Sequence, residues 1–430
     1  MHIGLYCPVE TGHLNTMLPI GEALLLKGHR VTFVGIADAQ AKVEAIGINF
    51  FPVAMESLPQ GSIEKIFETL GEREGLSALL YSIGIFRHVS YMVLQDGAIA
   101  CKDLKLDGMV IDQTSTEAVA IAKILNIPYV TVCSALPLNQ EAAIPAVFTT
   151  WQYGNSWFFK LRNQLTNYVG SLIGKIIHEP AKQFLKNNQL PIPTTFDSSL
   201  AIICHQPKSL EYPRQNLPNN FHFTGPFHTT TSRKFVDFPW EKLSDKPLIY
   251  ASMGTLQNRL KNTFQTIAAA CENLDIQLVI SLGGSANPED VPSLPGHPLV
   301  VRYAPQIELL QRASLTITHG GMNTTLESLT HGVPLVAIPI TNDQPGIAAR
   351  IKWSGCGEFL ELKQLTVQKL REKVKRVLEV PSYRDRAQQF QQEINHSGGI
   401  NQAIAIIEQA ISTQQPVVDW TPVIFDNFND

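Results

Sequence analysis

Short apolar strand patterns alternate with amphipathic helix patterns along most of this chain, and the alternation limits the folds open to it. In the first half, the segments HIGLYCP, RVTFVG, GMVID and PYVTVCS indicate buried strands with helices between them. The alternation restarts at residue 247 with PLIYASMG, IQLVISLGG, LTITHGG and PLVAIP. Strands that alternate with helices form parallel sheets covered on both faces. The sequence therefore predicts an α/β protein with two doubly wound parallel-sheet, Rossmann-like domains that face each other across a cleft.

A proline-rich stretch separates the two halves. Residues 213–247 contain five prolines and few apolar runs, which is typical of an interdomain linker. A chain of 430 residues also exceeds what one ordinary core holds together. The predicted organisation is an N-terminal domain (1–225), a linker (226–246), a C-terminal domain (247–381), helices that pack back on the N-terminal domain (382–413) and a tail (414–430).

Composition and charge narrow the class of protein. Hydrophobic residues make up 44% and charged residues 17% of the chain, and this balance is typical of globular proteins rather than disordered ones. The formal net charge of −4 gives no electrostatic reason to expect a nucleic-acid partner. Six cysteines lie apart without a CxxC pair, which favours buried thiols in a reducing compartment. With no signal-peptide pattern at MHIGLYCPVE and no long apolar run, we expect a cytoplasmic protein without a spanning helix.

Two segments of the first half depart from the alternation. Residues 62–95 and 144–185 are expected to be helical, and both are rich in apolar and aromatic side chains. Ordinary helix packing accounts for such segments. They could equally form an apolar acceptor pocket, or a surface through which the protein contacts a membrane peripherally. The sequence leaves these alternatives open.

Residues 303–344 contain the densest group of candidate ligand-binding residues. A strand ends at Thr318, a His-Gly-Gly turn follows, and a helix begins near Met322. The free N–H groups and positive dipole of a helix N-terminus suit a diphosphate, and glycines let it approach the backbone. Asn323, Thr324 and Thr325 add short polar side chains. Taken alone, a Gly-Gly turn before a helix predicts a simple tight turn equally well.

The whole segment resembles the donor-binding box of the inverting family 1 UDP-dependent glycosyltransferases, which have the GT-B fold. The WAPQ of that box occurs here as Tyr303-Ala304-Pro305-Gln306, and its THCGWNS occurs as THGGMNT over 318–324. Its glutamate is Glu327, and its closing acidic-Gln pair is Asp343-Gln344. Tyrosine and methionine replace the two tryptophans of the box, at 303 and 322.

The resemblance implies a role for each of these positions. The aromatic ring at 303 would stack on uracil with the glutamine at 306 near the nucleoside, and the helix N-terminus would hold the diphosphate. The glutamate would bind the ribose hydroxyls, and the last pair would bind the sugar. Met253-Gly254-Thr255 resembles a further phosphate-binding turn of the family. The expected donor-binding residues are Gly254, Thr255, Tyr303, Ala304, Gln306, His319, Gly321, Met322, Asn323, Thr324, Glu327, Asp343 and Gln344.

A candidate catalytic pair lies in the first half. His13 follows the first strand in what we expect to be a loop, and Asp112 ends the strand GMVID, so both lie at C-terminal strand ends. A carboxylate beside an imidazole raises its basicity and fixes its tautomer, and the family uses such a pair. Asp107 would lie at the wrong end of that strand, and Glu117 would lie inside the next helix. We therefore expect His13 to act as the base and Asp112 to assist it.

The resemblance implies an inverting transfer of a sugar from a UDP-sugar to a hydroxyl of a hydrophobic small molecule. It also implies that the domain 1–225 binds the acceptor and that the domain 247–381 binds the nucleotide-sugar. No metal or other cofactor is expected, because the chain has no Asp-x-Asp motif and no His/Cys ligand cluster. Residues 343–351 resemble the bacterial zeaxanthin glucosyltransferase branch, and Gln344 favours glucose by the same resemblance. Carotenoid, flavonoid or phenolic, sterol and macrolide acceptors stay open, as does TDP in place of UDP. The alternatives are a UDP-sugar 2-epimerase of the same fold and a non-catalytic nucleotide-sugar-binding protein.

Overall fold

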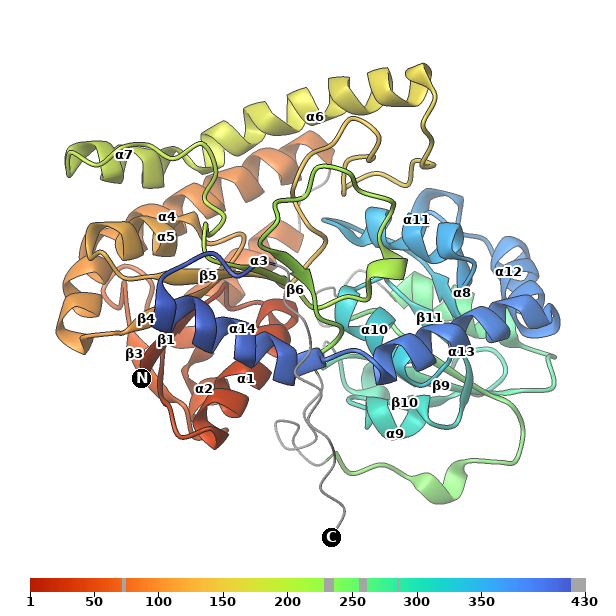
Figure 1. The fold of residues 1–430 in the computed structure, drawn as a ribbon. Coiled ribbons are helices and arrows are strands. Elements are labelled where there is room, and N and C mark those ends of the chain that lie inside the picture. Colours follow the sequence, from red (N-terminus) through yellow and green to blue (C-terminus); the bar gives the residue numbers. More distant parts are fainter. Residues whose placement is uncertain (72–74, 228–235, 255–260, 285, 419–430) are drawn as a thin grey trace, which may run out of the picture.

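Two parallel sheets form the centre of the molecule, one in each half of the chain (Figure 1). The computed structural model describes residues 1–71, 75–227, 236–254, 261–284 and 286–418. Helices flank both sheets (Figure 1). The predicted α/β class with two parallel-sheet domains is confirmed.

The first sheet has the strand order β3-β2-β1-β4-β5-β6-β7 within the described residues, and all neighbours are parallel. Its strands are β1 (His2–Tyr6), β2 (Arg30–Gly35), β3 (Asn49–Pro52), β4 (Gly108–Asp112), β5 (Tyr129–Cys133), β6 (Ile202–Cys204) and β7 (Phe221–Phe223). The helices of this half are α1 (Thr11–Leu26), α2 (Gln40–Glu44), α3 (Ser62–Gly71), α4 (Gly75–Leu104), α5 (Thr116–Ile124), α6 (Trp157–Ile177) and α7 (Glu179–Asn187).

The second sheet has the order β10-β9-β8-β11-β12-β13 over the part of the chain that is described, again parallel throughout. Its strands are β8 (Leu248–Ser252), β9 (Gln277–Ser281), β10 (Leu299–Val301), β11 (Ala313–Thr318), β12 (Leu335–Ala337) and β13 (Gly357–Phe359). The helices are α8 (Lys261–Cys271), α9 (Gln306–Leu310), α10 (Met322–Thr330), α11 (Gln344–Ser354), α12 (Val367–Glu379), α13 (Pro381–Asn395) and α14 (Gly399–Thr413).

The strand β4 shows why these runs are apolar without interruption. All five of its residues are buried. Val110 belongs to the apolar cluster on one face of the sheet, whereas Met109 and Ile111 belong to the cluster on the other face. Successive side chains of a strand point to opposite faces, so a sheet covered on both sides requires apolar residues at every position.

The C-terminal helix α14 lies on the first sheet, although α13 before it packs against α10 of the second half (Figure 1). Its isoleucines, among them Ile407 and Ile411, join the apolar cluster that contains Ile3 and Val110. Its Glu408 accepts a hydrogen bond from Lys27 Nζ at 3.0 Å, and its Oε1 lies 2.8 Å from His29 Nε2. The chain therefore returns to its first half. The domain boundaries predicted above stay predictions.

Two expectations about helices are wrong. The residues around His13 were expected to form a loop, but α1 begins at Thr11 and runs through Pro19. A proline inside a helix costs roughly 3 kcal/mol, and the burial of Leu14, Met17 and Ile20 on the same helix outweighs that cost. Residues 144–156 form no helix, because Pro145, a run of β-branched residues and a glycine disfavour one.

Some predicted features lie outside the described residues. These are Thr255, residues 228–235 of the predicted linker and residues 419–430 of the tail.

Candidate active site

His13 and Asp112 lie side by side at the C-terminal edge of the first sheet. β1 and β4 are neighbours; Asp112 ends β4, and His13 lies on α1, the helix that follows β1. The two side chains meet through His13 Nδ1 and Asp112 Oδ2 at 2.9 Å. His13 lies in the first turn of α1 and not in a loop as expected, so the helix fixes its position.

Two residues that the sequence did not single out complete this pair. Thr114 donates to Asp112 Oδ1 from its backbone N at 2.9 Å and from its hydroxyl at 2.6 Å. The Ser134 hydroxyl donates to Asp112 Oδ2 and also lies 2.7 Å from His13 Nδ1. Ser134 directly follows β5, the strand next to β4, and this position at a C-terminal strand end could have identified it from the sequence. Asp112 is thus held from three elements.

The electrostatics of the pair favour a charged carboxylate. Burial alone would raise the pKa of Asp112, but His13 and the hydrogen bonds from Ser134 and Thr114 lower it. Burial would lower the pKa of His13, and the Asp112 carboxylate, with smaller contributions from Glu10 and Asp343, raises it to about 9. Because Nδ1 is engaged by Asp112 and Ser134, Nε2 is the nitrogen left to take a proton.

The turn of the second half that is expected to bind phosphate is built around His319. Gly254 follows β8 with φ 78°, and Gly321 caps the N-terminus of α10. A Cβ on Gly254 would lie 3.0 Å from the His319 ring, and one on Gly321 would lie 2.5 Å from it. Burial lowers the pKa of His319 to about 4, so the ring is neutral. A neutral ring in this position can donate a hydrogen bond without carrying charge.

Two expected donor-binding residues, Gln306 of α9 and Glu327 of α10, contact each other, and Tyr250 of β8 contacts Gln306. Gln306 Nε2 donates to Glu327 Oε2, and Tyr250 donates to Gln306 Oε1 at 2.9 Å. Glu327 is almost fully buried by these neighbours. Ala304 belongs with the partly buried residues of the adjoining core. Met322 is buried in the core below α10, so its backbone rather than its side chain faces the turn.

Tyr303 lies apart from this group, with half of its side chain exposed (51%). Its ring rests on Gly284, which has φ 84°, and a Cβ at that glycine would collide with the Tyr303 hydroxyl. Gly284 thus meets the hydroxyl end of the ring, and the Arg302 guanidinium lies 5.9 Å from the ring centre. A half-exposed aromatic ring of this kind can stack on a planar base. Gly284 was not predicted, although it ends the run SLGG in the sequence.

Asn323 connects the two halves of the chain. Its Nδ2 donates to the carbonyl of Gly12 at 2.9 Å, and Thr16 donates to its Oδ1 at 3.4 Å. Both partners lie on α1, the helix that carries His13. Thr324 lies next to it on α10, where its carbonyl accepts from Ser328 at 2.8 Å. The N-terminus of α10 therefore contacts the helix that holds the candidate base.

Asp343 and Gln344 lie at the start of α11, close to the first half. Asp343 Oδ2 accepts from the backbone N of Leu136 at 3.1 Å, and Gln344 Oε1 accepts from Ile340 N and Thr341 N at 2.9 and 3.1 Å. Burial raises the pKa of Asp343, while the Leu136 N–H and the charge of His13 oppose that rise. The structure thus brings Asp343 into the field of His13.

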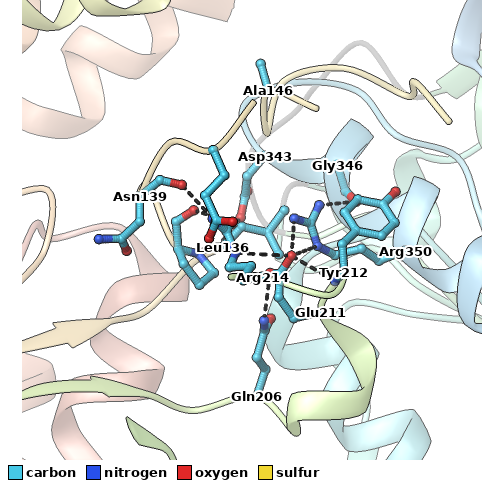
Figure 2. A network of polar contacts seen from close by, with 12 residues as sticks. Leu136, Asn139, Ala146, Gln206, Glu211, Tyr212, Arg214, Asp343, Gly346 and Arg350 are labelled. Atoms are coloured by element: carbon cyan, nitrogen blue, oxygen red, sulfur yellow. Dashed lines mark hydrogen bonds and ion pairs between the residues drawn. The ribbon is translucent and has the colours of Figure 1, made fainter. Parts of the chain in front are cut away.

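A buried polar network holds α11 against the first half (Figure 2). Arg350 donates to Glu211 Oε1 from Nε at 3.1 Å and from Nη2 at 2.6 Å, and its guanidinium lies 4.3 Å from the centre of the Tyr212 ring. Arg214 Nε lies 3.5 Å from the same oxygen. Burial would raise the pKa of Glu211, and the two arginines lower it. Sequence reasoning missed this network because its members lie 139 residues apart.

Gly346 allows α11 to lie close to the backbone of Val147 in the first half. Its N–H donates to the carbonyl of Val147 at 2.9 Å, and any Cβ would collide with that carbonyl. Asp343, Gly346 and Arg350 recur at helical spacing, so one face of α11 touches the first half.

The described residues contain no group of three or more His, Cys, Asp or Glu side chains that could hold a metal ion. Within the same residues, no helix has the length and apolar character needed to cross a membrane.

Comparison of the sequence with known proteins shows the family of this chain. The model of the UDP-glucoronosyl and UDP-glucosyl transferase family matches residues 4–397. A zeaxanthin glucosyltransferase from Pantoea ananas is 30% identical over 423 residues, which cover 97% of each chain. The NDP-glycosyltransferase YjiC from Bacillus subtilis (strain 168) is 27% identical over 95% of this chain and 96% of its own length.

Solved structures agree on the fold. The glycotransferase of kitacinnamycin superposes with a TM-score of 0.72 at 21% identity, covering 96% of this chain and 99% of its own. The calicheamicin glycosyltransferase CalG4 gives a TM-score of 0.71 at 22% identity with the same coverage. The GT-B fold is thereby confirmed, and the epimerase and non-catalytic alternatives gain no support. The chain belongs to the UDP-glucoronosyl and UDP-glucosyl transferase family and is a UDP-dependent glycosyltransferase.

Proposed function

We propose that this enzyme transfers glucose from UDP-glucose to a hydroxyl group of a hydrophobic small molecule, with inversion at the anomeric carbon. The observation that carries the proposal is the 2.9 Å contact between His13 and Asp112 opposite the N-terminus of α10. A base and a site for the leaving group then face each other across the two halves.

The proposed reaction is a single displacement. His13 Nε2 takes the proton of the acceptor hydroxyl, while Asp112 holds the ring and stabilises its charge. The acceptor oxygen attacks the anomeric carbon as the bond to the UDP oxygen breaks, which converts an α-linked donor into a β-glycoside. The free N–H groups at the start of α10, beside neutral His319, stabilise the charge that develops on the diphosphate. This scheme involves no metal.

The donor contacts are proposed on the resemblance and on position. Tyr303 would stack on uracil, Glu327 would bind the ribose, and Asp343 with Gln344 would bind the sugar. The exposed ring of Tyr303 supports the first of these roles. Gln344 has its Oε1 engaged by two backbone N–H groups, so its Nε2 would face the sugar. Asn323 would exchange a contact with Gly12 for one with the diphosphate.

Among the acceptors left open, we propose a carotenoid as the first to test. Two relatives, from Pantoea ananas and Pseudescherichia vulneris, are named zeaxanthin glucosyltransferases, and their names also support glucose. Phenolic, sterol and macrolide acceptors are the alternatives. Since a carotenoid partitions into lipid, we propose that the enzyme works in the cytoplasm and meets its acceptor at a membrane surface.

The test is an acceptor panel with UDP-glucose, read by mass spectrometry, with the anomeric configuration of the product determined by NMR. We expect a β-glucoside from at least one hydrophobic acceptor. His13→Ala should lower kcat by at least about a hundredfold, the size expected for a general base, while UDP binding measured by calorimetry stays unchanged. Near-normal turnover by His13→Ala would refute the role of His13, and an α-linked product would refute the single displacement.

A further inference from the structure

Helix α6 presents an apolar stripe to the outside of the molecule. Trp157, Leu161, Leu165, Tyr168 and Leu172 are all exposed, and Leu165 and Tyr168 each exceed 60%. At about 100° per residue, these positions fall within roughly a quarter of the helix circumference. Such a contiguous exposed stripe is unusual on a surface that meets only water.

The polar face of the same helix points inward. Asn163 is fully buried, and it donates to the carbonyl of Ala142 at 3.1 Å while accepting from Arg162. Asn167 donates to the carbonyl of Glu141 at 3.4 Å. A water-facing helix has the opposite arrangement, with its apolar side against the core. The outward stripe of α6 is therefore available to a non-aqueous partner.

The charge on α6 indicates which partner that is. The 21 residues of the helix include no aspartate or glutamate, and Lys160 and Lys175 are exposed near its two ends. Arg162 is held by the carbonyl of Gln152 at 2.9 Å and lies 4.6 Å from the Trp151 ring. On α7, Lys182 and Lys186 outnumber Glu179. An apolar stripe with lysines near both ends complements a lipid bilayer, which has an apolar interior and negatively charged headgroups.

We propose that the exposed face of α6 docks on an anionic lipid bilayer, with the helix lying in the plane of the interface. Trp157 and the leucines enter the acyl boundary, Tyr168 reaches the headgroup level, and the two lysines contact lipid phosphates. The purpose of this contact rests on the proposed hydrophobic acceptor, which dissolves in the same bilayer. The contact itself requires neither acceptor nor donor.

The experiment is flotation of the full-length protein with vesicles of phosphatidylcholine containing about 30% phosphatidylglycerol, in the absence of substrates. We expect binding that weakens with salt and is much weaker on phosphatidylcholine alone. Leu165→Glu should weaken binding at least about tenfold, since it places a charge in the apolar stripe. Leu26→Glu is the matched control, because Leu26 is an exposed leucine (82%) at the end of α1, and it should bind like the wild type.

A second measurement locates the contact. Vesicles with brominated acyl chains should quench tryptophan fluorescence in the wild type and quench Trp157→Phe markedly less. Equal quenching in both, no binding to anionic vesicles, or equal loss in Leu26→Glu would overturn the proposal. A concentration-dependent dimer that Leu165→Glu abolishes, without vesicle binding, would assign the face to a second copy instead. Leu165→Glu should still glucosylate a water-soluble phenol. This activity shows whether a failure concerns the membrane contact alone or the proposed function.

Discussion

Replacing Arg350 with methionine tests how strongly the buried network ties α11 to the first half of the chain. The Arg350 and Glu211 side chains are each 1% exposed, and their closest atoms lie 2.6 Å apart. Methionine keeps the aliphatic packing on Tyr212 and removes the cation. Glu211 would retain Arg214 at 3.5 Å and the Gln206 amide at 3.1 Å.

The expected loss of stability is large because a charge is left buried with incomplete partners. Breaking a buried ion pair by removing one partner costs about 3–5 kcal/mol. The contacts that remain to Glu211 place Arg350→Met at the lower end, at about 3 kcal/mol. Lys352→Met is the control on the same helix. Lys352 is 56% exposed and lies 4.0 Å from Glu358, so its loss should cost less than about 1 kcal/mol.

Urea unfolding followed by tryptophan fluorescence measures the difference. Trp353 of α11 packs edge-on against Tyr212, with the ring centres 5.1 Å apart, and reports on this interface. The KM for UDP-glucose should rise as well, since α11 carries Asp343 and Gln344 at its start. The double variant Glu211→Gln/Arg350→Met should recover most of the stability, because Arg214, which loses Glu211, keeps Glu141 at 3.9 Å and the carbonyl of Asn139 at 2.6 Å.

The pH dependence provides a further check on this network. The pKa of Glu211 is lowered in the folded protein, so the Glu211 carboxylate stabilises the fold at pH values above its unfolded pKa of about 4.5. This stabilisation is lost as the pH falls from there through the lower folded pKa. The wild type should therefore lose more stability on acidification than Arg350→Met. An Arg350→Met cost no greater than that of Lys352→Met would refute the view that this pair holds the two halves together.

Three other predictions follow from the site. His13 must be unprotonated to act as a base and its pKa is raised to about 9, so kcat/KM should rise with pH and level off above that value. Asp112→Asn removes the main charge that raises the pKa of His13, so it should shift the midpoint of this profile to lower pH. A flat pH profile would contradict the assignment of His13 as the base. Gly284→Ala should weaken UDP binding about tenfold by displacing Tyr303, whereas Gly296→Ala, which also has positive φ, should not; equal affinities by calorimetry would count against the stacking role. Excess EDTA should leave turnover unchanged, because the start of α10 is proposed to hold the diphosphate; activity lost with EDTA and restored by Mg²⁺ would contradict this.

The sequence was sufficient for the features that arise from local patterns. Runs such as GMVID and LTITHGG predict buried strands because a sheet covered on both faces demands apolar residues throughout. The ends of those strands were also the right places to look for polar residues. Local patterns failed at the start of α1, which begins at Thr11, whereas His13 was expected to lie in a loop.

Other features depend on contacts between distant segments. Ser134 is an ordinary residue after an ordinary strand, and only the pairing of β4 with β5 brings it to Asp112. Gly284 matters because of the tyrosine above it, and Glu211 matters because of an arginine 139 residues away. No spacing within a single element encodes such relations, so sequence periodicity does not predict them.

Those distant contacts decide how the two halves of the site meet. His13 is fixed by α1, whose first turn receives the Asn323 amide from α10, and Asp343 is fixed by the backbone of Leu136. The candidate base, the start of α10 (the proposed diphosphate site) and the proposed sugar-binding residues are therefore aligned through contacts across the two halves. An in-line displacement requires the base and the leaving group on opposite sides of one carbon, and small displacements weaken it severely. We therefore expect residues such as Arg350, which lie away from the candidate base, to affect catalysis by holding this alignment.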